Sequence, residues 1–292
     1  NFLLEIAVAN SLRTLYLHQK SPIKLLSVAQ DLISRHPNKT LALSYLANAQ
    51  LANNQKKQTE ITLQKIIDLD KRDIKHRFAL TRLLVGQPEK NGDALKLLNE
   101  ISSISPDNIP ILMQKANLLI KLKQYKNALK LAEEVDKLTP KTEFIHLIKG
   151  EIFLTEKKLA QALSAYHQAY KIKPSGKILF IITDIFMAKG DQPAATDFLK
   201  KELEKDNKNL SAHFKLATIY QQQNKITESA SEYQAILAVN PKNALALNNL
   251  AWLYLKNNNS NALILAKQAY NLAPNVADFA DTYGSALIKQ GN

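Results

Sequence analysis

The stretch IHLIKGEIFLTEKKLAQALSAYHQAYKIKP, residues 145–174, holds two apolar patterns of helical spacing separated by a short polar turn. Ala162 and Tyr166 are four residues apart and therefore lie on one face of a helix. Pro174 ends the second pattern, because a proline ring clashes with the preceding helical turn and offers no amide donor. The stretch predicts a pair of antiparallel α-helices and not strands.

The same pattern recurs along the chain with a period of 33 to 35 residues. Each unit closes on a proline or on Lys71 or Asn207 in its place. The closing residues are Pro37, Lys71, Pro106, Pro140, Pro174, Asn207, Pro241 and Pro274. An alanine that lets two helices approach closely stands twelve residues earlier in five units, at Ala94, Ala128, Ala162, Ala195 and Ala262.

The composition agrees with a helical protein. With 46% hydrophobic residues the chain can bury a core, and 7 glycines are few for the many turns of an all-β protein. The absence of cysteine excludes disulfides, thiolate zinc sites, iron–sulfur clusters and cysteine nucleophiles. The longest apolar stretch, residues 178–182, is far short of the roughly 20 residues that span a bilayer, so no membrane span is predicted.

Residues 145–174 resemble the tetratricopeptide repeat, and the likeness extends over essentially the whole chain. Its six characteristic positions hold Gly150, Phe153, Ala162, Tyr166, Ala169 and Pro174. The glycine of the first helix recurs only as Gly284. The resemblance implies an all-α, right-handed superhelical solenoid of antiparallel helix pairs, with about 17 helices.

We expect one solenoid domain over residues 1–292. Eight repeats end near residues 37, 71, 106, 140, 174, 207, 241 and 274, and the first helix of a ninth follows over residues 277–289. Since that ninth repeat lacks a second helix, the sequence is predicted to be a fragment. Any signal peptide or lipid anchor would then lie outside it.

In such a solenoid the first helices line a concave groove that can hold a peptide or a helix. The predicted groove residues are Phe78, Arg82, Met113, Asn117, Phe144, Leu147, Glu151, Leu154, Phe180, Asp184, Met187, Phe214, Asn248 and Trp252. The centre of the groove is apolar, with Glu151 and Asp184 beside it, and would suit an apolar segment that carries a positive charge. An open alternative is that these residues contact neighbouring repeats or fill a tightly wound superhelix.

Trp252 has two interpretations, an aromatic anchor for a ligand or packing between repeats eight and nine. Chaperone-binding members of the family hold a terminal carboxylate with Lys and Asn residues. Asn48 and Asn117 occupy one of these positions, but the completing positions hold Ser44, Ala79, Met113 and Ile148. A chaperone-tail adaptor is therefore not predicted.

The sequence carries no recognisable catalytic or metal-binding motif. No two of the six histidines are three or four residues apart, and there is no Gly-rich phosphate loop, GxSxG elbow or HExxH helix. We therefore predict no enzymatic activity, no metal and no cofactor. The excess of 39 Lys and Arg over 26 Asp and Glu gives a net charge of +13, spread as +8 and +5 over the two halves and mostly from Lys. A diffuse lysine coat does not favour nucleic-acid binding.

The sequence thus predicts a non-enzymatic scaffold for a protein or peptide partner. Residues 248–274, NNLAWLYLKNNNSNALILAKQAYNLAP, with Asp281–Gly284, resemble the tetratricopeptide-repeat lipoprotein that accompanies the PEP-CTERM/exosortase system. This resemblance implies the bacterial envelope, periplasmic or lipid-anchored, and a role in protein sorting or exopolysaccharide export and assembly.

Three alternatives stay open: a regulatory or substrate-positioning region of a larger enzyme, a binder of anionic surfaces, and a cytoplasmic location. Nothing in the sequence identifies the partner or the oligomeric state.

Overall fold

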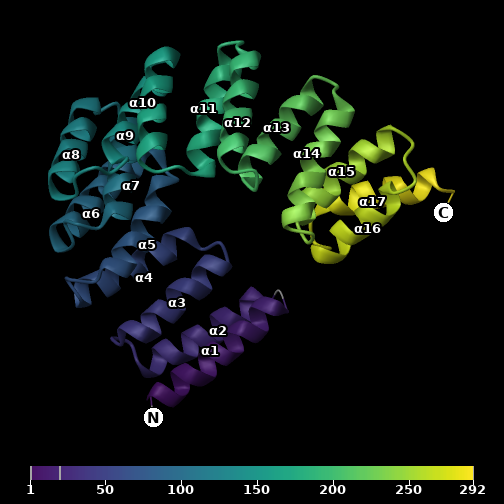
Figure 1. Ribbon diagram of the computed structural model, residues 1–292. Coiled ribbons are helices and arrows are strands. Elements are labelled where there is room, and N and C mark those ends of the chain that lie inside the picture. The colour runs from purple at the N-terminus through teal and green to yellow at the C-terminus, as the bar shows by residue number, and fades with distance from the viewer. Residues whose placement is uncertain (1, 20, 292) are drawn as a thin grey trace. The chain divides into compact units, whose positions relative to one another are not determined.

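The structure is a computed structural model that describes residues 2–19 and 21–291. Over these residues the chain is all-α, with seventeen α-helices, one short 3-10 helix and no strand (Figure 1). The first nine are α1 (Phe2–His18), α2 (Pro22–Arg35), α3 (Thr40–Ala52), α4 (Lys56–Leu69), α5 (Ile74–Val85), α6 (Asn91–Ile104), α7 (Ile109–Lys121), α8 (Tyr125–Leu138) and α9 (Phe144–Thr155), with the 3-10 helix η1 (Pro88–Lys90) before α6.

The remaining helices continue the alternation of first and second helices. They are α10 (Leu159–Ile172), α11 (Gly176–Ala188), α12 (Gln192–Lys205), α13 (Leu210–Gln222), α14 (Ile226–Val239), α15 (Ala244–Lys256), α16 (Ala262–Leu272) and α17 (Ala277–Lys289). The helices form two compact units, residues 1–148 and 149–292, with the boundary inside α9. Within each unit, helices that follow one another in the chain pack side by side.

The helix ends lie close to the predicted repeat ends, and the division into repeats stays a prediction. The second helices of the eight repeats end at Arg35, Leu69, Ile104, Leu138, Ile172, Lys205, Val239 and Leu272, each two residues before the predicted closing residue. The last helix, α17, covers the predicted residues 277–289. A single solenoid through both units stays a prediction, because each unit is described by itself.

A left-handed residue makes the turn inside six of the helix pairs. It stands two residues after the first helix, at Asn54, Lys123, Lys157, Gly190, Asn224 and Asn258, with φ between 54° and 74°. The amide of the next residue then donates to a carbonyl five residues back, as from Lys225 to Tyr220 at 2.9 Å. This hydrogen bond is the one that ends helices in the Schellman motif, and it turns the chain into the second helix.

Side-chain caps begin six of the helices whose N-caps the structure describes. An oxygen of the N-cap residue accepts the amide N–H three residues further on and so satisfies a donor that the helix leaves free. The capping residues are Asp73, Asn108, Ser175, Asp191, Asn209 and Asn243.

The core runs as seams between the helices of each pair. The five recurring alanines are fully buried at 0% exposure, except Ala262 at 4%, which confirms their predicted packing role. Four residues further on, Leu98, Tyr166 and Leu199 are likewise buried. Among the described residues, no helix is long and apolar enough to cross a membrane.

Candidate peptide-binding surfaces

The first unit has a pocket of about 290 Å³ between α3, α4 and α5. Asn48 and Arg82, at equivalent positions of two successive first helices, line it with exposed side chains. The rest of the lining is mostly apolar: Ala47, Leu51, Thr59, Leu63, Ala79 and Leu83. We call this the Arg82 pocket.

Arg82 makes no ion pair or hydrogen bond with any residue that the structure describes, so its guanidinium is free to bind a ligand. Thr59 occupies the position that alanine holds in other repeats, and its hydroxyl donates to the Gln55 carbonyl at 2.9 Å. Because that hydroxyl already donates to a backbone carbonyl, Thr59 adds no unsatisfied donor to the pocket. The lining therefore combines apolar walls with one cation and one amide.

The other predicted residues of the first unit are not gathered into a pocket. Phe78 is half-buried and packs on the core of α3 to α7, Met113 and Leu147 are half-buried, and Asn117 is exposed. Phe144 is 1% exposed. Its prediction as an open groove residue is corrected, because a ring buried to this depth is a core residue and offers no surface to a ligand.

The second unit has an aromatic surface between α11 and α13. The rings of Phe180 and Phe214 stack with centroids 6.4 Å apart, and both side chains are half-buried. The ammonium of Lys215 lies 5.4 Å from the centroid of Phe180 and pairs with the carboxylate of Asp184. The predicted acidic group beside the apolar surface is thus already neutralised, by a lysine that sequence reasoning missed.

Trp252 of α15 is half-buried and packs on the core of α13, α14 and α15. The ammonium of Lys256, one turn further along, lies 3.7 Å from the centroid of the indole ring and was also missed. Asn248 is only 7% exposed and is corrected to a buried residue. Its Oδ1 accepts no hydrogen bond from the described residues.

Three further predicted residues lie near the beginning of the second unit. Leu154 and Met187 are half-buried, and Glu151 is exposed and accepts a hydrogen bond from the Tyr166 hydroxyl at 2.9 Å. Burial raises the pKa of Tyr166, and the carboxylate of Glu151 raises it further, so this hydroxyl stays a donor. The predicted apolar floor across repeats four to six includes residues of both units and stays a prediction.

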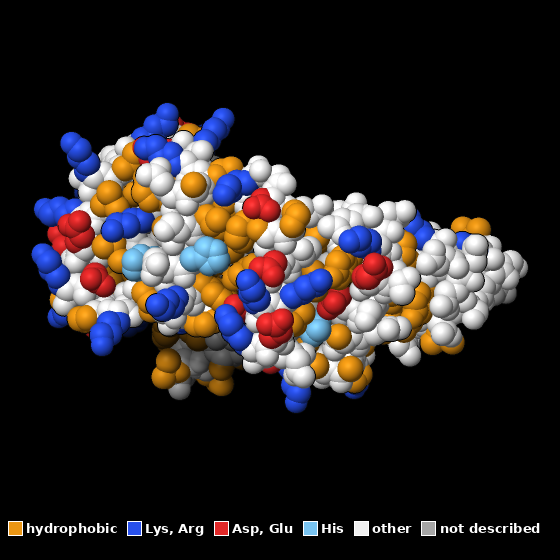
Figure 2. All heavy atoms as spheres, turned by 45° about the horizontal axis from the view of Figure 1, so that its top comes forward, with side chains coloured by type: hydrophobic (Ala, Val, Ile, Leu, Met, Phe, Trp, Pro, Cys, Tyr) orange, Lys and Arg blue, Asp and Glu red, His pale blue; other side chains and the backbone are white. Residues whose placement is uncertain are grey.

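On the face that Figure 2 shows, Lys and Arg side chains are dispersed among acidic and apolar ones. In the part of the chain that the structure describes, no three His, Asp or Glu side chains cluster as metal ligands would. Neither observation identifies a partner, and the absence of nucleic-acid binding and of cofactors stays a prediction.

Comparison with known proteins identifies the repeats. Family models described as tetratricopeptide repeat match residues 87–150 and residues 214–277. The chain contains tetratricopeptide repeats. No curated protein matches the sequence.

Two crystal structures show the same fold. One, a tetratricopeptide repeat protein from Parabacteroides merdae, is 11% identical with a TM-score of 0.55, over 97% of this chain and 99% of that one. The other, yeast Tom70, is 14% identical with a TM-score of 0.59, over 93% of this chain and 59% of that one. At these identities the likeness shows the fold alone.

Proposed function

We propose that the chain is a non-enzymatic scaffold that binds a peptide or helix of a partner protein on the surfaces of its first helices. Tetratricopeptide repeats generally mediate protein–protein interactions, and the described helices follow that architecture. The observation that carries the proposal is the free guanidinium of Arg82 beside the apolar walls of its pocket.

The chemistry of the Arg82 pocket selects one kind of peptide. A guanidinium binds a carboxylate through two parallel hydrogen bonds, and the amide of Asn48 adds a donor and an acceptor for a peptide backbone. Leu51 and Leu83 offer apolar contact to a neighbouring side chain. We therefore expect ligands in which a carboxylate adjoins an apolar residue, in contrast to the positively charged ligand predicted from Asp184.

Selection from a library of displayed random peptides on the immobilised chain tests this proposal. The enriched peptides are expected to pair an apolar residue with an acidic one. Arg82→Gln should weaken their binding about tenfold or more, because a charge-assisted pair contributes roughly 1.5–3 kcal/mol. Arg72→Gln is the matched control, since Arg72 is an exposed arginine of the same unit outside the pocket. Equal loss in both variants, or no loss at Arg82, would contradict the proposal.

The cellular setting that we propose is the bacterial envelope, with a role in protein sorting or exopolysaccharide export and assembly. Its support is the resemblance of residues 248–274 and 281–284 to the exosortase-associated lipoprotein. Fractionation of the native cells tests it, because recovery of the chain in the cytoplasm would contradict an envelope role.

A further inference from the structure

Three side chains of the first unit form a chain of hydrogen bonds between α3 and α5. Oγ of Ser44 in α3 lies 2.7 Å from Nε2 of His76 in α5, and Nδ1 of the same imidazole lies 2.7 Å from Oδ2 of Asp73. A hydroxyl that is joined through an imidazole to a carboxylate has the arrangement that makes serine a nucleophile. We call these residues the Ser44 triad, and the scaffold role proposed above makes no use of them.

Local structure holds the imidazole and leaves the hydroxyl accessible. Asp73 is the N-cap of α5, and its Oδ1 accepts the amide N–H of His76 at 2.6 Å, which places the carboxylate beside the imidazole. His76 is only 9% exposed, so its neighbours keep the ring in place. Ser44 is half-buried, and a small molecule can approach it from solvent.

The carboxylate of Asp73 determines which nitrogen of His76 carries the proton. Burial opposes the charged form of this carboxylate, but hydrogen bonds from the amide and the imidazole of His76 hold its pKa below the usual value. An ionised carboxylate only accepts, so the neutral imidazole carries its hydrogen on Nδ1 and presents the lone pair of Nε2 to the hydroxyl of Ser44. Nε2 has no other hydrogen-bond partner among the residues that the structure describes.

The Ser44 hydroxyl has a second acceptor, the Thr40 carbonyl at 2.7 Å. That carbonyl already accepts an amide N–H inside α3, as helical carbonyls do. Since both acceptors lie 2.7 Å from Oγ, rotation of the hydroxyl hydrogen alone turns it toward Nε2. Ser102 of α6 has only the first kind of contact. It is half-buried and donates to the Leu98 carbonyl at 2.7 Å, and no histidine in the described part of the chain hydrogen-bonds to it.

The Arg82 pocket begins one helical turn beyond the Ser44 triad. Asn48 follows Ser44 by four residues on α3, and Ala79 follows His76 by three on α5, so each pair shares a helix face. The apolar walls of the pocket suit an aliphatic chain attached to the serine. The side-chain amide of Asn48 makes no hydrogen bond with the described residues, and it is a donor for the oxygen that becomes negative when an ester is attacked.

We propose that Ser44 is a covalent modification site that takes the acyl group from an ester of an aliphatic carboxylic acid. The hydroxyl oxygen bonds to the carbonyl carbon of the ester while its proton passes to Nε2 of His76. The bond between that carbon and the leaving oxygen then breaks, and the leaving group takes the proton from Nε2 and departs as an alcohol. Acyl-Ser44 remains. This modification requires no catalytic turnover and does not depend on which peptide the Arg82 pocket binds.

Labelling of the full chain with an alkyl fluorophosphonate, which phosphonylates activated serines and releases fluoride, tests this proposal. Peptide mapping by mass spectrometry is expected to find the label on Ser44 and not on Ser102, which matches it in burial and in its backbone hydrogen bond. His76→Gln should slow labelling roughly a hundredfold, the usual contribution of a general base. His213→Gln is the matched control, because His213 is also 9% exposed and has a carboxylate partner at 2.6 Å but no serine partner.

Asp73→Asn tests whether the carboxylate positions the imidazole. Asparagine caps α7, α13 and α15 in the same way, so this variant keeps the cap of α5 and loses only the charge. Labelling should slow about tenfold or more, and NMR of the imidazole nitrogens should show that His76 loses its preference for the Nδ1–H tautomer. An unchanged tautomer and an unchanged rate would overturn this role of Asp73.

Two results would overturn the proposal itself: a label spread over exposed hydroxyls, or equal labelling rates for the native chain and a folded His76→Gln variant. Transfer of the butyryl group from p-nitrophenyl butyrate to Ser44 should follow the same order of variants, and its absence would contradict an acyl donor. Arg82→Gln should weaken binding of acidic peptides and leave the labelling of Ser44 unchanged, so the Ser44 triad and the Arg82 pocket can fail independently.

Discussion

Gly150 lies against the ring of Tyr166 at the beginning of the second unit. A Cβ atom at this position would stand 2.7 Å from Cε2 of that ring, much closer than side chains pack. The ring cannot yield easily, because Tyr166 is fully buried and its hydroxyl is held by Glu151. Gly284 occupies the equivalent position in the ninth repeat, yet a Cβ there would meet nothing within 4 Å.

We predict that Gly150→Ala lowers the free energy of unfolding by roughly 1–3 kcal/mol, because the new methyl group overpacks the seam. Gly284→Ala is the control and should be neutral or stabilising by up to about 1 kcal/mol, since alanine is the better helix former. Urea denaturation followed by circular dichroism measures both. A loss of the same size in the two variants would show that helix propensity, and not the Tyr166 ring, decides the outcome.

Phe144 and Asn248 show where single positions escape prediction. Periodicity places both on the predicted inner face of a first helix, and this angular position is all that a repeat can fix. How deeply a side chain is buried depends on its neighbours. These leave Phe144 only 1% exposed and Asn248 only 7% exposed. Lys215 and Lys256 were missed for a related reason. Their long side chains reach the rings of Phe180 and Trp252 from positions that the prediction did not assign to the groove.

At the scale of elements, α10, α11 and α12 are joined by an aromatic cluster around His167. The imidazole of His167 lies edge-on to Phe186 at 6.0 Å and to Phe198 at 5.4 Å between centroids. Tyr170 packs on Phe198 and donates to the buried carboxylate of Glu202 at 2.8 Å. Burial lowers the pKa of His167, which Glu202 only partly offsets, so the folded state holds this histidine neutral.

This pKa shift makes stability depend on pH. A histidine with a pKa below about 6.5 in the folded state binds protons more readily when unfolded, so stability is complete above about pH 6.5 and falls as the pH drops below it. We predict that His167→Phe flattens the curve of unfolding free energy between about pH 5 and pH 7.5 relative to the native chain. His18→Gln, at an exposed histidine, serves as the control. If the difference in unfolding free energy between the native chain and His167→Phe stayed constant across this pH range, protonation of His167 would not be coupled to stability.

Element boundaries were predictable because local chemistry specifies them. A closing proline follows six of the second helices by two residues and excludes another helical turn, whereas Lys71 and Asn207 hold the same place without that constraint. The turns inside the pairs depend on residues that tolerate a left-handed backbone, and Asn54, Asn224 and Asn258 are of this kind. Lys123 and Lys157 take the same conformation without a sequence signal, so only the periodicity predicts those turns.

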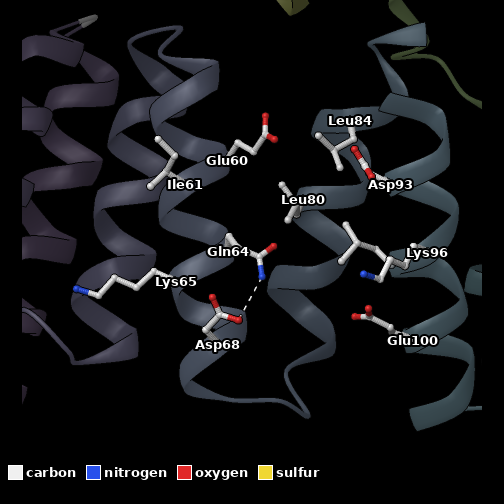
Figure 3. Close-up of a pocket in the computed structure, with 11 residues that line it drawn as sticks. Glu60, Ile61, Gln64, Lys65, Asp68, Leu80, Leu84, Asp93, Lys96 and Glu100 are labelled. Atoms are coloured by element: carbon white, nitrogen blue, oxygen red, sulfur yellow. Dashed lines mark hydrogen bonds between the residues drawn. The ribbon is translucent and has the colours of Figure 1, made fainter. Parts of the chain in front are cut away.

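At the scale of the molecule, the pockets were the least predictable feature. The pocket of about 550 Å³ in the first unit is lined by eleven residues of three helices, α4 of one predicted repeat and α5 and α6 of the next (Figure 3). The sequence predicts only a diffuse lysine coat for the basic residues, and nothing in it predicts a pocket between second helices. The lining arises only when α4 and α6 come together over Leu80 and Leu84, and this packing cannot be read from the sequence pattern.

In an array of repeats, the stability of each helix depends on its neighbours and little on distant repeats. The reason is that each helix packs mainly on the helices next to it. Tyr233 of α14 is fully buried in the core of α13 to α15, where it contacts Phe214 edge-on and accepts a hydrogen bond from Asn249 at 3.1 Å. Removing this ring leaves a cavity and costs roughly 3–5 kcal/mol. The loss of stability should therefore be confined to the helices that surround the cavity.

We predict that Tyr233→Ala lowers amide hydrogen-exchange protection in α13, α14 and α15 by several orders of magnitude while α10 keeps most of its protection. Val239→Ala, at an exposed site of the same helix, is the control. It should change the protection neither of α13 to α15 nor of α10. Exchange measured by mass spectrometry on peptides of the second unit resolves these helices. An equal loss in α10 and α14 would mean that the second unit unfolds as one cooperative block, and its repeats could not then be treated as a sum of neighbouring interfaces.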